Sequence, residues 1–264
     1  MLILSFFLYI IVGSLAGIAG GLLGIGGGTI IVPCLVIIFK MIELPQAYIM
    51  HLAIGSSLAS IVFSTLSAAR AHNRRGAVAW DFVKRMLPGT LIGCLLGGFF
   101  AQTISGVILE IIFGIFVFSL GLHFLRPIKD EHRETRMPGF PLIDISSSLI
   151  ASLSSILGIG GGVLLVPFLN HHRVNEKKAI GTSTALSSFI SVFGACFYAG
   201  FGMKELGVGI NLGYIYLPAF VFLSISSYLS APYGAKLAHH VPTKLLRKIF
   251  ASTLMFVGVL MIAK

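Results

Sequence analysis

The sequence predicts an all-α polytopic membrane protein made of two inverted repeats, each a broken helical hairpin followed by three transmembrane helices. Three observations support this prediction. The composition is that of a membrane protein, a glycine-rich segment occurs twice, and most of the positive charge lies in a few short loops. Together they divide the chain into a first repeat (residues 1–125), a linker (126–140) and a second repeat (141–264).

The composition leaves too little polar surface to cover a soluble globule of 264 residues. Hydrophobic residues make up 56% and charged residues only 11%, and the mean hydropathy is +0.97. Most of the apolar runs near residues 52–69, 86–102, 107–125, 179–200, 213–235 and 249–263 have the roughly 17 to 25 residues that a spanning helix needs. Two further runs, 2–39 and 141–170, are too long for one crossing.

Both long runs contain the same glycine-rich pattern. Gly24–Pro33 and Gly158–Pro167 each read Gly-x-Gly-Gly-Gly-x4-Pro, so each run is expected to break there and to resume as a new half-helix. Broken backbone inside a membrane is tolerated only where protein buries it or where it lines a watery cavity. The free N–H groups at the start of each new half-helix favour an anion, so the duplicated break predicts an anion site near the membrane midplane.

The basic residues decide how the two long runs are threaded. If each run is a hairpin that returns to its starting side, 16 of the 19 Lys and Arg residues share one face, in the loops around 70–85, 126–136, 173–178 and 236–248. The positive-inside rule makes that face cytoplasmic. The N-terminus is then expected outside, and the odd number of crossings in each half inverts the two halves relative to each other.

A second matched element follows each hairpin, at Ala53–Ala59 and Ala179–Ala185, and its hydroxyls are expected to line the same route. The predicted substrate-binding residues are Gly24, Gly26, Gly27, Gly28, Thr29, Ser56, Ser57, Gly158, Gly160, Gly161, Gly162, Thr182 and Ser183. An alternative interpretation stays open for both elements. The glycines could serve only close helix packing, and the hydroxyls could bond back to their own helices.

Other function classes receive little support from the sequence. The net charge of +10 lies in short loops without interleaved aromatic residues, so no nucleic-acid partner is expected. The predicted spans contain no nucleophile, paired carboxylates or metal-ligand cluster, and we therefore expect no enzyme activity, no cofactor and no metal. Histidines such as His51 and His72 fall at predicted membrane ends and are interpreted as solvated loop residues. The expected partners are a small anion and the lipid bilayer, and a homo-oligomer is possible.

The paired glycine pattern, with the Ala-Ile-Gly-Ser/Thr-Ser element after each copy, resembles the sulfite exporter TauE/SafE family over essentially the whole chain. The resemblance implies a permease of the bacterial inner membrane that moves sulfur-containing anions such as sulfite or organosulfonates, with export as the expected direction. An anion channel of the same architecture and a non-transporting membrane scaffold remain alternatives. The halves differ in loop length, Lys40–His51 against His171–Lys178, and in Thr29 against Val163.

Overall fold

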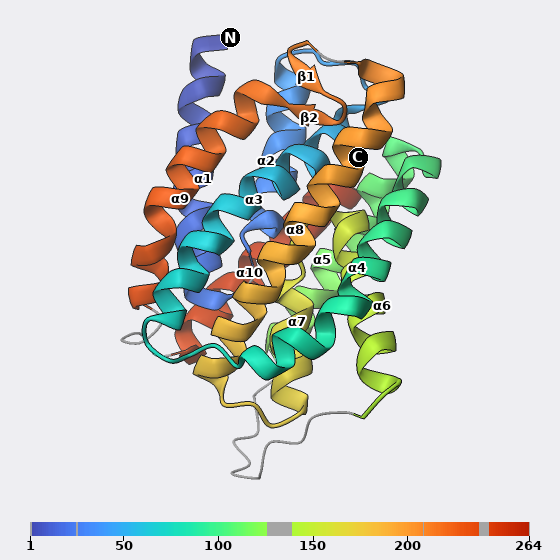
Figure 1. Cartoon of the computed structure of the whole chain (residues 1–264). Helices are drawn as coiled ribbons and strands as arrows, with labels where there is room; N and C mark the ends of the chain where they lie inside the picture. The colour runs from blue at the N-terminus through green and yellow to red at the C-terminus, as the bar shows by residue number, and fades with distance from the viewer. Residues whose placement is uncertain (1, 25, 126–138, 208, 238–242, 264) are drawn as a thin grey trace.

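The computed structural model describes residues 2–24, 26–125, 139–207, 209–237 and 243–263. In this part of the chain it contains ten α-helices and one small antiparallel hairpin (Figure 1), which confirms the predicted all-α fold. The elements are α1 (Leu2–Leu23), α2 (Gly28–Met41), α3 (Ile49–Asn73), α4 (Trp80–Thr103), α5 (Gly106–Leu125), α6 (Leu142–Leu157), α7 (Gly162–His171), α8 (Glu176–Leu206), β1 (Asn211–Leu212), β2 (Ile215–Tyr216), α9 (Leu217–Leu237) and α10 (Thr243–Ile262). Five of the helices are long and apolar enough to cross a membrane.

Both overlong apolar runs fold as broken hairpins. α1 and α2 form the first one, and Leu4 and Leu8 near its start line a small cavity together with Ile38 and Met41 near its end. α2 therefore returns to the end of the molecule at which α1 begins. The second hairpin, α6 and α7, opens at the opposite end (Figure 1).

The outer arm of each hairpin packs on a helix of the other half of the chain. α1 lies along α9, and α6 lies along α4. Glycines spaced four residues apart form the contact face in α1 (Gly13, Gly17, Gly21) and in α4 (Gly89, Gly93, Gly97). A Cβ atom on Gly17 would lie 2.8 Å from the Cα of Ser227, so these stripes let the backbones approach closely.

α3 and α8 pack against each other at the centre of the bundle and carry the two matched hydroxyl elements. α3 is the most buried of the five candidate spans. Large apolar side chains on the outer helices, such as Phe7 of α1 and Phe99 of α4, are exposed, as expected where lipid covers the surface.

The described basic loops gather at one end of the molecule. Arg75, in the loop between α3 and α4, donates to the carbonyl oxygen of Ala235 at the end of α9, at 3.0 Å. At the other end Lys40 forms an ion pair with Glu110, 2.8 Å between Nζ and Oε1. The linker residues 126–138 and Lys264 lie outside the described residues.

Several predicted boundaries were wrong, those of α4 and α9 among them. α4 begins at Trp80, six residues before the predicted apolar run, so Lys84 and Arg85 lie in its first turns and not in a loop. The run predicted at 213–235 starts as the β1–β2 hairpin and becomes helical only at Leu217. Gly213, with a φ of +56°, forms the turn that makes this segment leave the helical path.

Candidate functional site

The described glycines of the two breaks have matching φ angles. Three glycines in each break adopt a positive φ, which is strained for residues that carry a Cβ atom. They are Gly24, Gly26 and Gly27 at +71°, +77° and +80°, and Gly158, Gly160 and Gly161 at +71°, +68° and +85°. The last glycine of each pattern begins the return helix, α2 at Gly28 and α7 at Gly162.

The two breaks touch each other although they lie 134 residues apart in the sequence. A Cβ atom on Gly28 would collide with the carbonyl oxygen of Gly158 and would lie 2.6 Å from the Cα of Ile159. A Cβ atom on Gly26 would lie 3.4 Å from the carbonyl oxygen of Ile159. Since Gly28 is helical, its lack of a side chain serves this close approach and not an unusual φ.

Ser57 and Ser183 connect each break to the central helix of the other half. The hydroxyl of Ser57 in α3 donates to the carbonyl oxygen of Gly158 at 2.9 Å. The hydroxyl of Ser183 in α8 donates to the carbonyl oxygen of Gly24 at 3.2 Å and to that of Ile180 at 2.9 Å. Both serines are fully buried, and their hydroxyl protons are directed at protein carbonyls. They hold the breaks in place.

Ser56 and Thr182, next to these serines, anchor two extended loop segments. Ser56 accepts a hydrogen bond from the backbone N–H of Tyr216 at 2.8 Å, and Thr182 accepts one from the N–H of Ala79 at 2.9 Å. The predicted hydroxyl pairs therefore lie beside the breaks, but each has a protein partner in this structure.

Residues 214–216, between α8 and α9, are called the α8–α9 seal. Residues 77–79, between α3 and α4, are called the α3–α4 seal. A Cβ atom on Gly55 would collide with the carbonyl oxygen of Tyr214, and one on Gly181 would collide with that of Ala77. The first seal thus presses on α3 and the second on α8, each at a glycine followed by a hydroxyl residue. Burial raises the pKa of the Tyr214 hydroxyl above its usual value.

A side chain next to each seal contacts the last turn of a hairpin arm. His72 of α3 has its Nε2 3.0 Å from the carbonyl oxygen of Gly21, just before the first break. Tyr198 of α8 donates to the carbonyl oxygen of Ile156, just before the second break, at 3.4 Å. The two residues hold matching positions, 126 residues apart, like Ser57 and Ser183.

The interpretation of His51 and His72 as solvated loop residues was wrong. Their side chains are 6% and 1% exposed. The Nε2 of His51 lies 3.2 Å from the carbonyl oxygen of Ala101, and its ring packs on that of Tyr214, 5.1 Å between centroids. α3 is longer at both ends than the apolar run predicted at 52–69, so both rings enter the packed interior.

Several polar groups at the breaks have no partner in the part of the chain that the structure describes. These are the N–H groups that begin α2 and α7, on Gly28, Thr29, Gly162 and Val163, and the buried hydroxyls of Thr29 and Ser191. Ser191 lies beside the second break, since a Cβ atom on Gly160 would lie 3.1 Å from its Oγ. Such groups are available to a ligand that accepts hydrogen bonds.

Fixed charge is absent from the described interior. Its buried side chains with polar groups are those of Ser, Thr, Tyr and His, and no described Lys, Arg, Asp or Glu is buried. The described residues also hold no cluster of three His, Cys, Asp or Glu side chains suited to a metal ion. The local electrostatics of the breaks therefore come from backbone dipoles and hydroxyls.

Sequence reasoning missed Ser191, Ile61 and both seals. Ser183, Ser187 and Ser191 repeat every four residues and so share one face of α8, a signal that could have identified Ser191. Ile61 has its Cγ2 3.4 Å and 3.0 Å from the Cβ positions of Gly26 and Gly160, so it packs against both breaks. An isolated apolar residue in an apolar helix gives no such signal.

Comparison with known proteins agrees with this architecture. The family model of the sulfite exporter TauE/SafE family matches residues 9–261. A probable membrane transporter protein of Haemophilus influenzae is 33% identical over 259 residues, covering 97% of this chain and 98% of that protein. One of Methanocaldococcus jannaschii is 28% identical over 261 residues, covering 97% and 94%. No solved structure matches the chain. The chain belongs to the sulfite exporter TauE/SafE family of membrane transporters.

Proposed function

We propose that this membrane transporter carries small sulfur-containing anions, such as sulfite or organosulfonates, and binds them where the two glycine breaks meet. The observation that carries the proposal is the contact between the breaks, in which the first residue of the half-helix α2 lies against the Gly158–Ile159 backbone, a few residues before the half-helix α7 begins. Their first N–H groups have no acceptor among the described residues, and an oxyanion would supply one. The family's name adds the sulfur chemistry.

The absence of a buried cation among the described residues fits transport better than tight capture. A fixed Lys or Arg in a low-dielectric site would hold an anion strongly and slow its release. Half-helix dipoles are weaker, and they need no counter-ion when the site is empty. We therefore expect a site that binds its anion briefly and passes it on.

We infer that the two halves are inverted repeats that move relative to each other. In support, the hairpins α1–α2 and α6–α7 open at opposite ends, and each pairs with the other half through the Ser57 and Ser183 hydrogen bonds. The basic loops lie at one end of the described chain, so the positive-inside rule orients that end toward the cytoplasm and the N-terminus outside. For a bacterial protein this membrane would be the inner one.

In this mechanism the seals are the two gates. Release of the α3–α4 seal from Gly181 and Thr182 would open the break region to the cytoplasm, and release of the α8–α9 seal from Gly55 and Ser56 would open it to the outside. Both seals are in contact with their partners in the structure, and the proposed mechanism assigns this arrangement to the occluded state. Alternating access requires that one seal opens at a time.

Uptake of radiolabelled sulfite into proteoliposomes tests this proposal. We expect saturable flux at a transporter's modest rate, which Gly28→Leu abolishes and Gly200→Leu preserves. Gly200 is the matched control because it is also helical and has no atom within 4 Å of its Cβ position. Non-saturating flux would identify a channel, and no flux above empty liposomes would favour a scaffold.

A further inference from the structure

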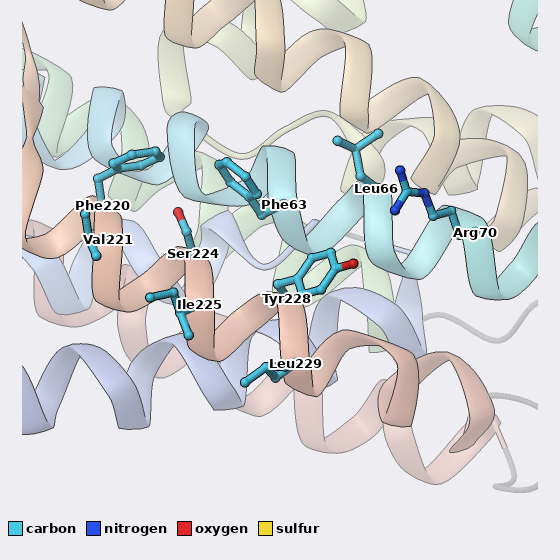
Figure 2. Close-up of a pocket in the computed structure, with 9 residues that line it drawn as sticks. All are labelled: Phe63, Leu66, Arg70, Phe220, Val221, Ser224, Ile225, Tyr228 and Leu229. Atoms are coloured by element: carbon cyan, nitrogen blue, oxygen red, sulfur yellow. The ribbon is translucent and has the colours of Figure 1, made fainter.

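An apolar groove runs along the membrane-facing side of α3 and α9 and ends at a guanidinium group (Figure 2). Its volume is about 580 Å³, within the roughly 300 to 1,000 Å³ of ligand sites in proteins. Phe63 and Phe220 close one end, with ring centroids 5.9 Å apart. Arg70 and Tyr228 stand at the other end, and we call this feature the Arg70 groove.

Exposed apolar side chains are expected on any surface that faces lipid, so they do not by themselves indicate a binding site. This groove differs because it is concave and because one end is cationic. Ser224 lies within it at 6% exposure, and its small side chain leaves room between the larger Phe220 and Tyr228 on the same helix. Ile225 and Leu229 flank it with more than half of their surface exposed.

Arg70 is an exposed cation without an acceptor among the described residues, one turn before α3 ends. Its neighbour Arg75 is different, because its Nη1 already donates to the carbonyl oxygen of Ala235 at 3.0 Å. The Tyr228 hydroxyl lies on the Arg70 side of the groove in Figure 2, and its oxygen points the same way. A guanidinium and a phenol together offer donors suited to a phosphate group.

We propose that the Arg70 groove binds an anionic phospholipid of the adjacent leaflet, with an acyl chain between α3 and α9 and the phosphate on Arg70. The length of the groove agrees with a bound acyl chain. Phe63 and Arg70 are seven residues apart, or about 10 Å along the helix at 1.5 Å per residue. Half of a hydrocarbon core is about 15 Å, and an arginine extends its head group further toward the interface.

Other occupants match only part of the groove. A helix from a second copy of the chain would cover its apolar walls but would bring the guanidinium into an apolar contact without a counter-charge. A small oxyanion such as sulfite would satisfy Arg70 and leave the apolar walls without a partner. A phospholipid satisfies both features, and its binding does not depend on what the protein transports.

Native mass spectrometry of the delipidated protein in detergent tests the proposal with two probes, dioleoyl phosphatidylglycerol and dioleoyl phosphatidylcholine. We expect the anionic lipid to bind at least several-fold more tightly than the zwitterionic one. Arg70→Ala should weaken phosphatidylglycerol roughly tenfold, as expected for the loss of a charge-assisted hydrogen bond. Arg74→Ala is the matched control, because it removes the same charge from an exposed site at the end of α3 outside the groove.

A second variant tests the acyl chain site separately. Ser224→Phe should fill the groove and weaken both lipids, while Ser119→Phe on the exposed side of α5 should not. Equal losses in Arg70→Ala and Arg74→Ala would overturn the proposal, as would equal affinities for the two lipids. A dimer whose formation protects position 225 from labelling, with no lipid preference, would assign the groove to a second copy instead.

Discussion

Ser57 of α3 and Gly158 of the second break are joined by a buried hydrogen bond of 2.9 Å that connects the two halves of the chain. Ser183 and Gly24 form the matching bond in the opposite direction at 3.2 Å. Each half therefore holds the break of the other half through one of these hydrogen bonds. This reciprocal arrangement explains why the Gly-rich pattern and the Ser-containing element occur as a pair in both halves.

Removal of either serine hydroxyl should loosen one break. Ser57→Ala and Ser183→Ala each leave a buried carbonyl without its partner, which should lower the free energy of unfolding by about 1 to 3 kcal/mol. Sulfite flux should fall but persist, because the backbone N–H groups of the site remain. Thermal unfolding in detergent and proteoliposome flux measure the two effects. Ser119→Ala, whose hydroxyl bonds only to Ile115 of its own exposed helix, should change neither.

Gly27 and Gly161 should not tolerate larger residues. Both have a strongly positive φ, and a Cβ atom on Gly27 would lie 2.7 Å from the carbonyl oxygen of Ala16. Gly27→Leu and Gly161→Leu are expected to abolish flux while the protein still inserts. Since these variants also strain the backbone, Gly28→Ala is the cleaner test of the contact between the breaks. If Gly28→Ala transports at the parental rate, the breaks are packing elements and the site assignment is wrong.

A disulfide bond should hold the α3–α4 seal in its contact with α8. With the native cysteines replaced, Ala79→Cys together with Thr182→Cys places a thiol on each of two residues that are now joined by a hydrogen bond of 2.9 Å, from the backbone N–H of residue 79 to the side chain of residue 182. Oxidation should stop flux, and a reductant should restore it, because the seal must leave Thr182 in each cycle. Each single cysteine variant is the control. Flux that continues at the parental rate in the fully crosslinked protein would show that residues 77–79 are not a gate.

The orientation of the chain can be tested by labelling single cysteines in intact cells. Ala47→Cys lies in the exposed connection between α2 and α3 and should react rapidly with a membrane-impermeant reagent. Arg75→Cys, in the exposed loop between α3 and α4, should react only after permeabilisation. The expected contrast follows from the gathering of basic loops at the Arg75 end. The reverse pattern would place the N-terminus in the cytoplasm.

The sequence predicted the hairpins and the candidate glycines because both depend on local chemistry. A positive φ favours glycine, and an apolar run of 2–39 has to fold back whatever surrounds it. The sequence did not predict the hydrogen-bond partners of Ser56 and Ser57, because the partners lie about 100 or more residues away, in the other half of the chain. The same holds for His72, whose burial depends on the docking of α1 and not on its own neighbours.

The last prediction concerns charge selectivity. The described interior near the breaks offers N–H groups and hydroxyls without a buried cation or carboxylate, so it should favour anions over cations and neutral solutes. A helix terminus contributes on the order of 0.3 to 1 kcal/mol when exposed and more when partly buried, so the helix termini at the two breaks should give modest affinity. Dipoles discriminate by charge more than by shape. Excess methanesulfonate should therefore lower sulfite flux, whereas Zn²⁺, Mg²⁺ and an uncharged sugar should not. Transport of a cation or a sugar in the same liposomes would mean that the dipole argument has the wrong sign, and the assignment of the breaks as the substrate site would fail with it.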